Sequence, residues 1–323
     1  MTANPVALGI VGAGIMGERL LGAALSQASD VVRIAGIWDP SAEAMARIAA
    51  AFPGVPRLAD AAAVTAACDA LYIASPPSSH LGYGRMALAS GKAVFCEKPL
   101  AVDVADARAF VAEAGGRGAV NFPFASSFGV ATLTRWIGEG AVGTARHITI
   151  EVAFATWPRS WQMDAAGWLD GRAQGGFTRE VVSHFLFLSR RLGGPLTGLK
   201  ATADYPEVGR SERRIAATLT AGALPATLAG NVGTTAKDDH NIWMIEGEAG
   251  AVRLRDWSIA ERRMADGSWQ PDPEALPNEK MRPLVLRRQL EGVAALVRGE
   301  AHHLATLAEA LEVQEMVEGI LKG

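Results

Sequence analysis

A lysine between a glutamate and a proline is the residue of this sequence that most needs a chemical explanation. Lys98 directly follows Glu97 and the short apolar run 93–96, which is typical of a buried strand, and Pro99 stops that strand. Lysine is strongly hydrated and is seldom buried without a partner, so its place at the end of a core strand needs a reason. A solvated lysine in an ordinary turn is the simpler alternative. The chemical alternative is an amine that donates a hydrogen bond to a ligand or exchanges a proton with it.

A Gly-x-Gly-x-x-Gly loop over residues 12–17 adds a second chemical function. It follows the apolar run 6–11 and opens a helical stretch, which is the context that a dinucleotide-binding loop requires. The first glycine permits a tight turn, the second lets the backbone approach a pyrophosphate, and the third lets the helix pack closely on the strand. Phosphates would lie against the helix N-terminus. The predicted contacts are Gly12, Gly14, Ile15, Met16 and Gly17.

A carboxylate at the end of the second apolar run predicts which dinucleotide binds. Asp39 follows the run 31–38 and stands 22 residues after Gly17. From this position a carboxylate accepts hydrogen bonds from the adenosine ribose and repels a 2′-phosphate, so we expect NAD in preference to NADP. Arg47 is near enough to weaken that preference. A turn or helix-capping role is the alternative for Asp39.

The elements that must position these residues change character along the chain. Apolar runs alternate with helical stretches up to about residue 122, which predicts a parallel sheet with crossover helices. Further on, several strand-like runs are separated by turns alone, which favours an antiparallel sheet. We therefore expect an α/β protein with an N-terminal Rossmann doubly wound parallel sheet over 1–122 and a C-terminal α+β domain with a large, mostly antiparallel sheet over 123–323. Whether the closing helices, 283–299 and 304–321, pack back on the first domain is left open.

The composition excludes several function classes. A net charge of −3 and a pI near 6.1 argue against a nucleic-acid or membrane partner. No apolar run approaches the roughly 18 residues of a spanning helix, and the start, residues 1–5, lacks the features of a signal peptide. Two cysteines, Cys68 and Cys96, form neither a disulfide framework nor a metal cluster. We expect a cytoplasmic protein without a metal site, whose partner is a small-molecule substrate.

Three motifs in order carry a family resemblance. They are the glycine loop, the turn Ser-Pro-Pro-Ser-Ser-His at 75–80, and Gly-Lys-Ala-Val-Phe-Cys-Glu-Lys-Pro-Leu at 91–100. Together they resemble the glucose-fructose oxidoreductase / inositol dehydrogenase / rhizopine-catabolism (Gfo/Idh/MocA) family of NAD(P)-dependent oxidoreductases. The resemblance also implies a homodimer or homotetramer built on the antiparallel sheet. It adds four residues to the predicted cofactor site: Ser75, Pro76, His80 and Glu97.

The same resemblance implies partners for Lys98 in the second domain. In the family a helix there carries Asp-x-Gly-x-His after a glycine cluster, and the matching stretch here is 175–184. Glu180 stands at the place of the aspartate and His184 at that of the histidine, and their spacing of four puts both on one helix face. Phe187 occupies the place of a second family aspartate, and an arginine that the family often has after residue 120 is missing. The resemblance therefore implies intact hydride chemistry in a less polar site.

These residues lead to a reaction hypothesis. A hydride would pass between the nicotinamide and the secondary alcohol or carbonyl of a sugar, polyol or related cyclic alcohol. His184 would be the general base, Lys98 would donate a hydrogen bond to the substrate oxygen, and Glu180 would orient the pair, although Lys98 and His184 could exchange roles. The physiological direction stays open. The alternatives are a reductase of a non-sugar carbonyl or conjugated ring and, further away, a non-catalytic dinucleotide-binding regulator.

Aromatic and basic residues before this helix are candidates for substrate contacts. A sugar or cyclic polyol could stack on Trp161, and Arg179 could bind a carboxylate or phosphate on the substrate. Trp157, Trp168, Arg159 and Arg172 share these possibilities. The alternatives are packing in the core or at a subunit interface for the tryptophans and an exposed surface position for the arginines.

Overall fold

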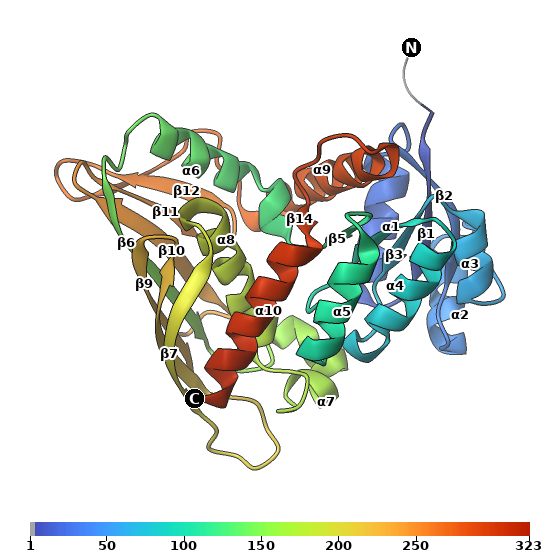
Figure 1. Ribbon diagram of the computed structural model, residues 1–323, viewed down its shortest axis with the longest axis horizontal. Helices are drawn as coiled ribbons and strands as arrows, with labels where there is room; N and C mark the ends of the chain where they lie inside the picture. The colour runs from blue at the N-terminus through green and yellow to red at the C-terminus, as the bar shows by residue number, and fades with distance from the viewer. Residues whose placement is uncertain (1–3) are drawn as a thin grey trace. The chain divides into compact units, whose positions relative to one another are not determined.

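Two sheets organise two units in the computed structural model, which describes residues 4–323 apart from the side chain of Asp164 (Figure 1). The first unit comprises residues up to Ser126 together with Arg282–Leu311. The second comprises Ser127–Met281 and Glu312–Gly323. Arg282–Leu311, which lies within the expected domain 123–323, thus groups with the first unit. Residues 1–3 of the start that was searched for a signal peptide lie outside the described residues.

The first unit contains the predicted doubly wound sheet. Its six strands run in the order β14-β5-β4-β3-β1-β2, and all neighbours are parallel except the short β14, which is antiparallel to β5. Every residue of β1, β3 and β4 is buried, as expected for strands covered by helices on both faces. The strands are β1 Val6–Val11, β2 Val32–Trp38, β3 Ala70–Ile73, β4 Ala93–Cys96, β5 Gly118–Val120 and β14 Ala305–Thr306.

Helices cover both faces of this sheet. Apolar residues of α1, α2 and α9 share one buried cluster with β1, β3 and β4, while α3, α4 and α5 lie in a row on the opposite face (Figure 1). Aspartate or serine caps several of these helices; Ser41, Asp60 and Asp103 each accept a hydrogen bond from a first-turn amide. Sequence analysis did not assign α3. The helices are α1 Ile15–Gln27, α2 Ala42–Ala51, α3 Ala61–Ala67, α4 His80–Ala89, α5 Val104–Ala114 and α9 Asn278–Arg298.

The second unit contains the predicted antiparallel sheet. Its eight strands run in the order β13-β12-β11-β10-β6-β9-β8-β7, and β6–β9 is the single parallel pair in this order. Burial alternates along β8 and β9, so one face of these strands is buried and the other is exposed. The strands are β6 Ala145–Phe154, β7 Leu196–Asp204, β8 Arg214–Ala221, β9 Leu224–Val232, β10 His240–Gly247, β11 Ala251–Arg255, β12 Ile259–Arg263 and β13 Trp269–Pro271.

The helix expected to carry Glu180 and His184 has an irregular start. Thr178–Val182 forms a π-helical turn, and the α-helix α8 follows over Ser183–Gly193. A helix was expected here and is present, but its π-helical first turn was not predicted, because spacing in the sequence does not distinguish a π turn from an α turn. Single π turns inside helices occur frequently at functional sites. The other helices of this unit are α6 Phe128–Gly138, α7 Ala166–Leu169 and the end of α10 Leu307–Lys322.

Close backbone contacts explain two of the three glycines in the loop before α1. A Cβ on Gly17 would lie 2.0 Å from the carbonyl oxygen of Gly12, and Gly12 itself has a φ of +106°. Both positions therefore need glycine for the fold. Gly14 differs, since a Cβ there would meet no atom within 4 Å. Open space above Gly14 is what a ligand that approaches the backbone would require.

Two alanine substitutions separate these roles. Gly17→Ala should lower the melting temperature by several degrees, because overpacking costs about 1–3 kcal/mol. Gly14→Ala should leave the melting temperature nearly unchanged yet weaken NADH binding, since its methyl group would project into the open space. Thermal melts and NADH fluorescence titrations measure both effects. Equal melting temperatures for the two variants would contradict the packing argument.

Candidate functional site

The turn that carries Lys98 is anchored through the buried carboxylate of the preceding residue. Glu97 Oε1 accepts hydrogen bonds from Tyr72 Oη at 2.5 Å and from Asn121 Nδ2 at 2.6 Å, and Asn121 Oδ1 accepts one from Gln289 Nε2 of α9. Burial, followed by the charge of Glu97, raises the pKa of Tyr72 well above its usual value, so its hydroxyl remains a donor. Glu97, predicted as a cofactor contact, therefore ties together the ends of three strands and α9.

The residue after Lys98 is anchored as well. The imidazole of His80 is buried, and its Nδ1 lies 2.9 Å from the carbonyl oxygen of Pro99 while its Nε2 lies 2.8 Å from that of Ser75. The ring thus connects the loop after β3 with the turn after β4. Lys98 itself is half-buried and stands between two residues whose positions are fixed by buried contacts.

The protonation of His80 limits these contacts. Carbonyl oxygens only accept, and a neutral imidazole has one N–H, so both bonds form together only in the charged ring. Burial lowers the pKa of His80 from its ordinary value, the positive charge of Lys98 lowers it further, and the carbonyl groups of Ser75 and Pro99 oppose the shift. At neutral pH we therefore expect a neutral ring that donates to one carbonyl group at a time.

The glycine loop and Asp39 lie in contact. Asp39 Oδ2 accepts a hydrogen bond from the amide of Ala13 at 2.8 Å, and Oδ1 accepts one from Ser41 at 2.8 Å. Each carboxylate oxygen keeps a second lone pair, so this turn role does not exclude contacts to a ribose. Arg47 also reaches the loop, where its Nη2 donates to the carbonyl of Ala13 at 3.2 Å and pairs with Glu18.

These features of the first unit fit a dinucleotide. Gly14 is the N-cap of α1 and makes no side-chain cap, so the first-turn amides have no side-chain acceptor at that position. Such a helix N-terminus favours an anionic pyrophosphate. Ile15 is exposed beside it and Met16 is half-buried. At the neighbouring strand end, the hydroxyl of Ser75 bonds that of Ser79 at 2.7 Å, and Pro76 immediately follows Ser75.

The second unit holds the other two predicted catalytic residues. Glu180 is half-buried in the π turn, and its amide donates to the carbonyl of Gly176 at 3.1 Å. His184 is buried in the first turn of α8. Glu180 thus lies in the π turn and His184 in the α-helix that directly follows it. Lys98 belongs to the first unit, so the convergence of all three residues on one substrate is a proposal.

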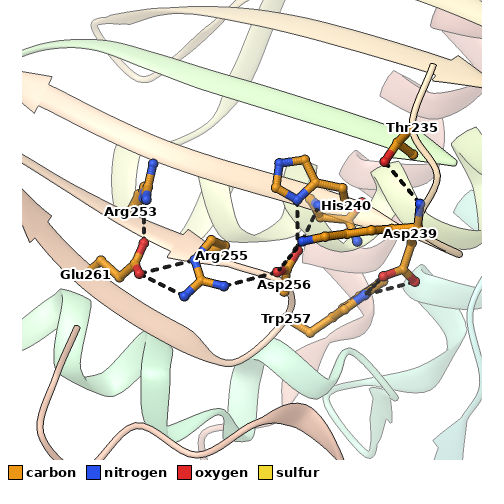
Figure 2. A network of polar contacts seen from close by, with 10 residues as sticks. Thr235, Asp239, His240, Arg253, Arg255, Asp256, Trp257 and Glu261 are labelled. Carbon is orange, nitrogen blue, oxygen red and sulfur yellow. Dashed lines mark hydrogen bonds and ion pairs between the residues drawn. The ribbon is translucent and has the colours of Figure 1, made fainter. Parts of the chain in front are cut away.

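An aromatic residue that sequence analysis missed packs against His184. The rings of His184 and Trp257 meet edge to face, with centroids 5.4 Å apart, and the same indole ring contacts Phe185. Its Nε1 donates to both carboxylate oxygens of Asp239 at 3.3 Å (Figure 2). No motif marked Trp257 or Asp239, because they lie far from the helix in sequence and reach His184 only through the folded sheet.

The predicted substrate contacts have unequal surroundings. Trp161 is 44% exposed, and the guanidinium group of Arg159 lies 4.8 Å from its ring centroid. Arg159 in turn pairs with Asp239 at 2.8 Å, which links Trp161 to the residues around His184. Arg179 is instead buried: its Nε and Nη2 pair with Glu318, and its Nη1 donates to two backbone carbonyl groups. Those bonds indicate a structural role for Arg179.

The shifted pKa of His80 predicts how stability depends on pH. A histidine with a lowered pKa in the folded state contributes stability above its unfolded pKa of about 6.5, and that stability is lost as the pH falls through the folded value. His80→Asn should therefore reduce the loss of unfolding free energy between pH 7.5 and pH 5.5. Urea denaturation at both pH values measures this, with His147→Asn on β6 as the control. An unchanged difference between the two pH values in His80→Asn would contradict the assignment.

The described residues were also searched for a membrane-spanning helix and for a metal site. None of the described helices is long and apolar enough to span a membrane. Within the same residues, no group of three or more His, Cys, Asp or Glu side chains is arranged to hold a metal ion.

Comparison with known proteins agrees with this geometry. The chain is 36% identical to inositol 2-dehydrogenase of Cereibacter sphaeroides over 114 residues, which are 34% of this chain and 33% of that protein. It is 30% identical to D-apiose dehydrogenase of Paraburkholderia graminis over 183 residues, 54% of this chain and 47% of the relative. The matched segments therefore span about a third to a half of these relatives.

A solved structure and a family model extend the comparison. The WlbA dehydrogenase of Bordetella pertussis, solved with NADH and UDP-GlcNAcA, superposes with a TM-score of 0.81 at 21% identity, covering 100% of this chain and 96% of that one. This shows a shared fold. Residues 6–123 match the GFO_IDH_MocA model, described as an oxidoreductase family with an NAD-binding Rossmann fold. Over these residues the chain matches the Gfo/Idh/MocA oxidoreductase family model, as its motifs predicted.

Proposed function

We propose that this protein is an NAD(P)-dependent oxidoreductase that transfers a hydride between the nicotinamide and a secondary alcohol or carbonyl of a sugar, polyol or related cyclic alcohol. One observation carries the proposal. Lys98 is half-buried at the carboxyl end of a central strand, and buried contacts fix both Glu97 and Pro99 beside it. In a doubly wound sheet this edge opens onto the ligand crevice. A cation held there is suited to act on a bound substrate oxygen.

The first unit would hold the cofactor. The amides at the start of α1 would bind the pyrophosphate, and Asp39 would accept hydrogen bonds from the adenosine ribose. When bound, the dinucleotide supplies the hydride acceptor or donor at its nicotinamide ring. We propose NAD as the preferred form. Arg47 lies beside the same loop, so its positive charge limits the preference that Asp39 creates.

Proton handling would fall to side chains of both units. In the oxidation direction, Lys98 would donate a hydrogen bond to the substrate hydroxyl oxygen and lower its pKa, while His184 would accept the hydroxyl proton. Glu180 would orient the pair. The exchanged assignment, with Lys98 as proton acceptor, uses the same atoms and differs in which side chain is neutral before the reaction. Among the relatives, one acts on inositol and another on D-apiose by name, which supports a hydroxylated substrate.

A second candidate is a reductase of a non-sugar carbonyl or conjugated ring. The observation that favours it is Phe187, which is buried where the family resemblance implies a second aspartate. A non-catalytic regulator would bind the dinucleotide without turnover on any substrate. Screening NAD reduction over polyols and sugars, and NADH oxidation over carbonyl compounds, separates the three.

We also propose a homodimer or homotetramer that associates through the large sheet. The outer face of β8 and β9 carries exposed small side chains in register, with Ala216 opposite Ala229 and Thr218 opposite Thr227. Small side chains permit close approach of a second sheet. Light scattering coupled to gel filtration measures the oligomeric state.

The cofactor proposal predicts a change in nucleotide preference. The wild-type protein should bind NADH more tightly than NADPH, because the carboxylate of Asp39 repels a 2′-phosphate. Asp39→Asn should reduce the ratio of the two affinities by about tenfold, a change of roughly 1.4 kcal/mol. Fluorescence titrations with both nucleotides measure it, and Asp60→Asn, which alters the N-cap of α3, is the control. If the ratio of NADH affinity to NADPH affinity were equal in the wild type and in Asp39→Asn, Asp39 would not contact the ribose.

The proton-handling proposal predicts a separation of turnover from binding. Lys98→Met should reduce turnover by about a hundredfold or more, since positioned acid–base groups contribute that much. NADH affinity should stay within a few-fold, because the loop before α1 is unaltered. Lys92→Met, a change of the same type before β4, should behave like the wild type. Near-normal turnover of Lys98→Met on the substrate found in the screen would rule out its catalytic role.

A further inference from the structure

The turn between β11 and β12 has an unusual backbone. Asp256 and Trp257 have φ values of 46° and 75°, and no other described non-glycine residue has a positive φ. The left-handed region is uncommon for non-glycine residues and exceptional for bulky ones. Such conformations persist where the surroundings determine them, and they cluster at functional sites. Glycine at position 257 would adopt this conformation without strain, so the tryptophan side chain itself needs an explanation.

Polar contacts hold this turn in place. Asp256 Oδ1 lies 3.2 Å from His240 Nδ1, and Oδ2 accepts from Arg255 at 3.1 Å (Figure 2). The amide of Asp256 also donates to the carbonyl of Asn241 at 3.0 Å. On the other side, Glu261 accepts from Arg255 (Figure 2). The neighbouring strands therefore fix the backbone of the strained turn.

The strained conformation directs the indole toward α8. Its ring meets His184 edge to face and also packs on Phe185. Its N–H is shared between the two oxygens of Asp239 (Figure 2). Arg159 pairs with that carboxylate at 2.8 Å. The side chain of Arg159 is itself 7% exposed and bonds Gln162 at 2.9 Å. A continuous set of contacts thus runs from the buried Arg159 through the half-buried Asp239 and Trp257 to the buried imidazole of His184.

We infer that Trp257 and Asp239 are positioning residues that set the orientation of the His184 ring. An imidazole exchanges protons with a substrate only when one ring nitrogen lies within hydrogen-bond reach of the reacting oxygen. The indole ring of Trp257 packs against the imidazole of His184 and restricts its rotation. The carboxylate of Asp239, which accepts from the indole N–H, in turn restricts the position of the indole. The expected effect on turnover rests on the proposed function, because it assumes that His184 accepts or donates the substrate proton. The contact between Trp257 and His184, and its effect on the orientation of the imidazole, do not depend on the reaction.

Replacing the strained tryptophan separates stability from activity. Trp257→Gly should lower the melting temperature less than Trp257→Ala does, because both lose the indole packing but glycine alone accepts the left-handed conformation. Turnover should nevertheless fall by about ten- to a hundredfold, the usual effect of a misplaced catalytic group. NADH affinity should stay within about twofold, since the glycine loop belongs to the other unit. A Trp257→Gly protein with wild-type turnover on a confirmed substrate would overturn the inference.

Two milder substitutions keep the test decisive if Trp257→Gly fails to fold. Trp257→Phe retains an aromatic ring and the same backbone demand but loses the N–H that binds Asp239. Asp239→Asn retains an acceptor for the indole but loses the charge that pairs with Arg159. Each should lower kcat more than it changes KM. Asp238→Asn, which alters the adjacent acid that bonds Ser160, is the matched control and should behave like the wild type.

A measurement without substrate distinguishes this inference from the proposed function. Nitrogen-15 NMR of labelled histidine rings follows the titration of His184, assigned by comparison with His184→Gln. In Trp257→Phe and Asp239→Asn the ring-nitrogen shifts of His184 should move, and its titration midpoint should change by more than about 0.3 pH unit. Unchanged shifts and midpoint would overturn the inference, whatever the turnover. Altered shifts in a protein that turns over no alcohol would sustain the inference and reject the reaction.

Discussion

The buried carboxylate of Glu97 is the constraint on which the first half of the site depends. A carboxylate that leaves water must be compensated by hydrogen bonds, and here the donors are Tyr72 and Asn121. These donors come from the ends of the strands on either side of β4, so the bonds form only when β3, β4 and β5 are in their observed parallel register. The position of Lys98 is thereby tied to the registry of the whole sheet and not to the local turn alone.

The second unit uses a buried acid in the same way. Glu212 accepts hydrogen bonds from the amide and the hydroxyl of Thr178 at 2.7 and 2.6 Å, at the point where the π turn begins. Burial raises the pKa of Glu212, and its bonds to Thr178 oppose that shift. The start of the segment that carries Glu180 and His184 is thus fixed from the sheet side. In both units a buried acid holds the backbone next to the residues that we propose as catalytic.

Part of the fold and of the candidate site could be predicted from the sequence, and the rest could not, because it depends on contacts between residues far apart in the chain and on backbone conformation. The parallel sheet and the glycine loop follow from local periodicity and spacing, and both were confirmed. The π turn was not predictable, since a separation of four residues has the same appearance in either helix type. Trp257 was missed because the position of its side chain depends on a left-handed backbone conformation. Tryptophan rarely adopts that conformation, so the sequence gives no reason to expect it there. Arg179 seemed available for a ligand until the fold brought Glu318, 139 residues away, to its guanidinium group.

Contacts between residues far apart in the chain also bear on the charge of the substrate. An anionic substrate would need an uncompensated cation in the second unit, and the sequence offered three arginines there. Arg159 is paired with Asp239 and Arg179 with Glu318, whereas the exposed Arg172 lies over the ring of Tyr205 at 3.9 Å, a contact that does not neutralise its charge. An Arg–Asp pair presents both donors and acceptors with little net charge, which suits hydroxyl groups better than a carboxylate. The pairing around Trp161 and His184 therefore supports a neutral hydroxylated substrate, even though Phe187 removes the acid that the family resemblance implied.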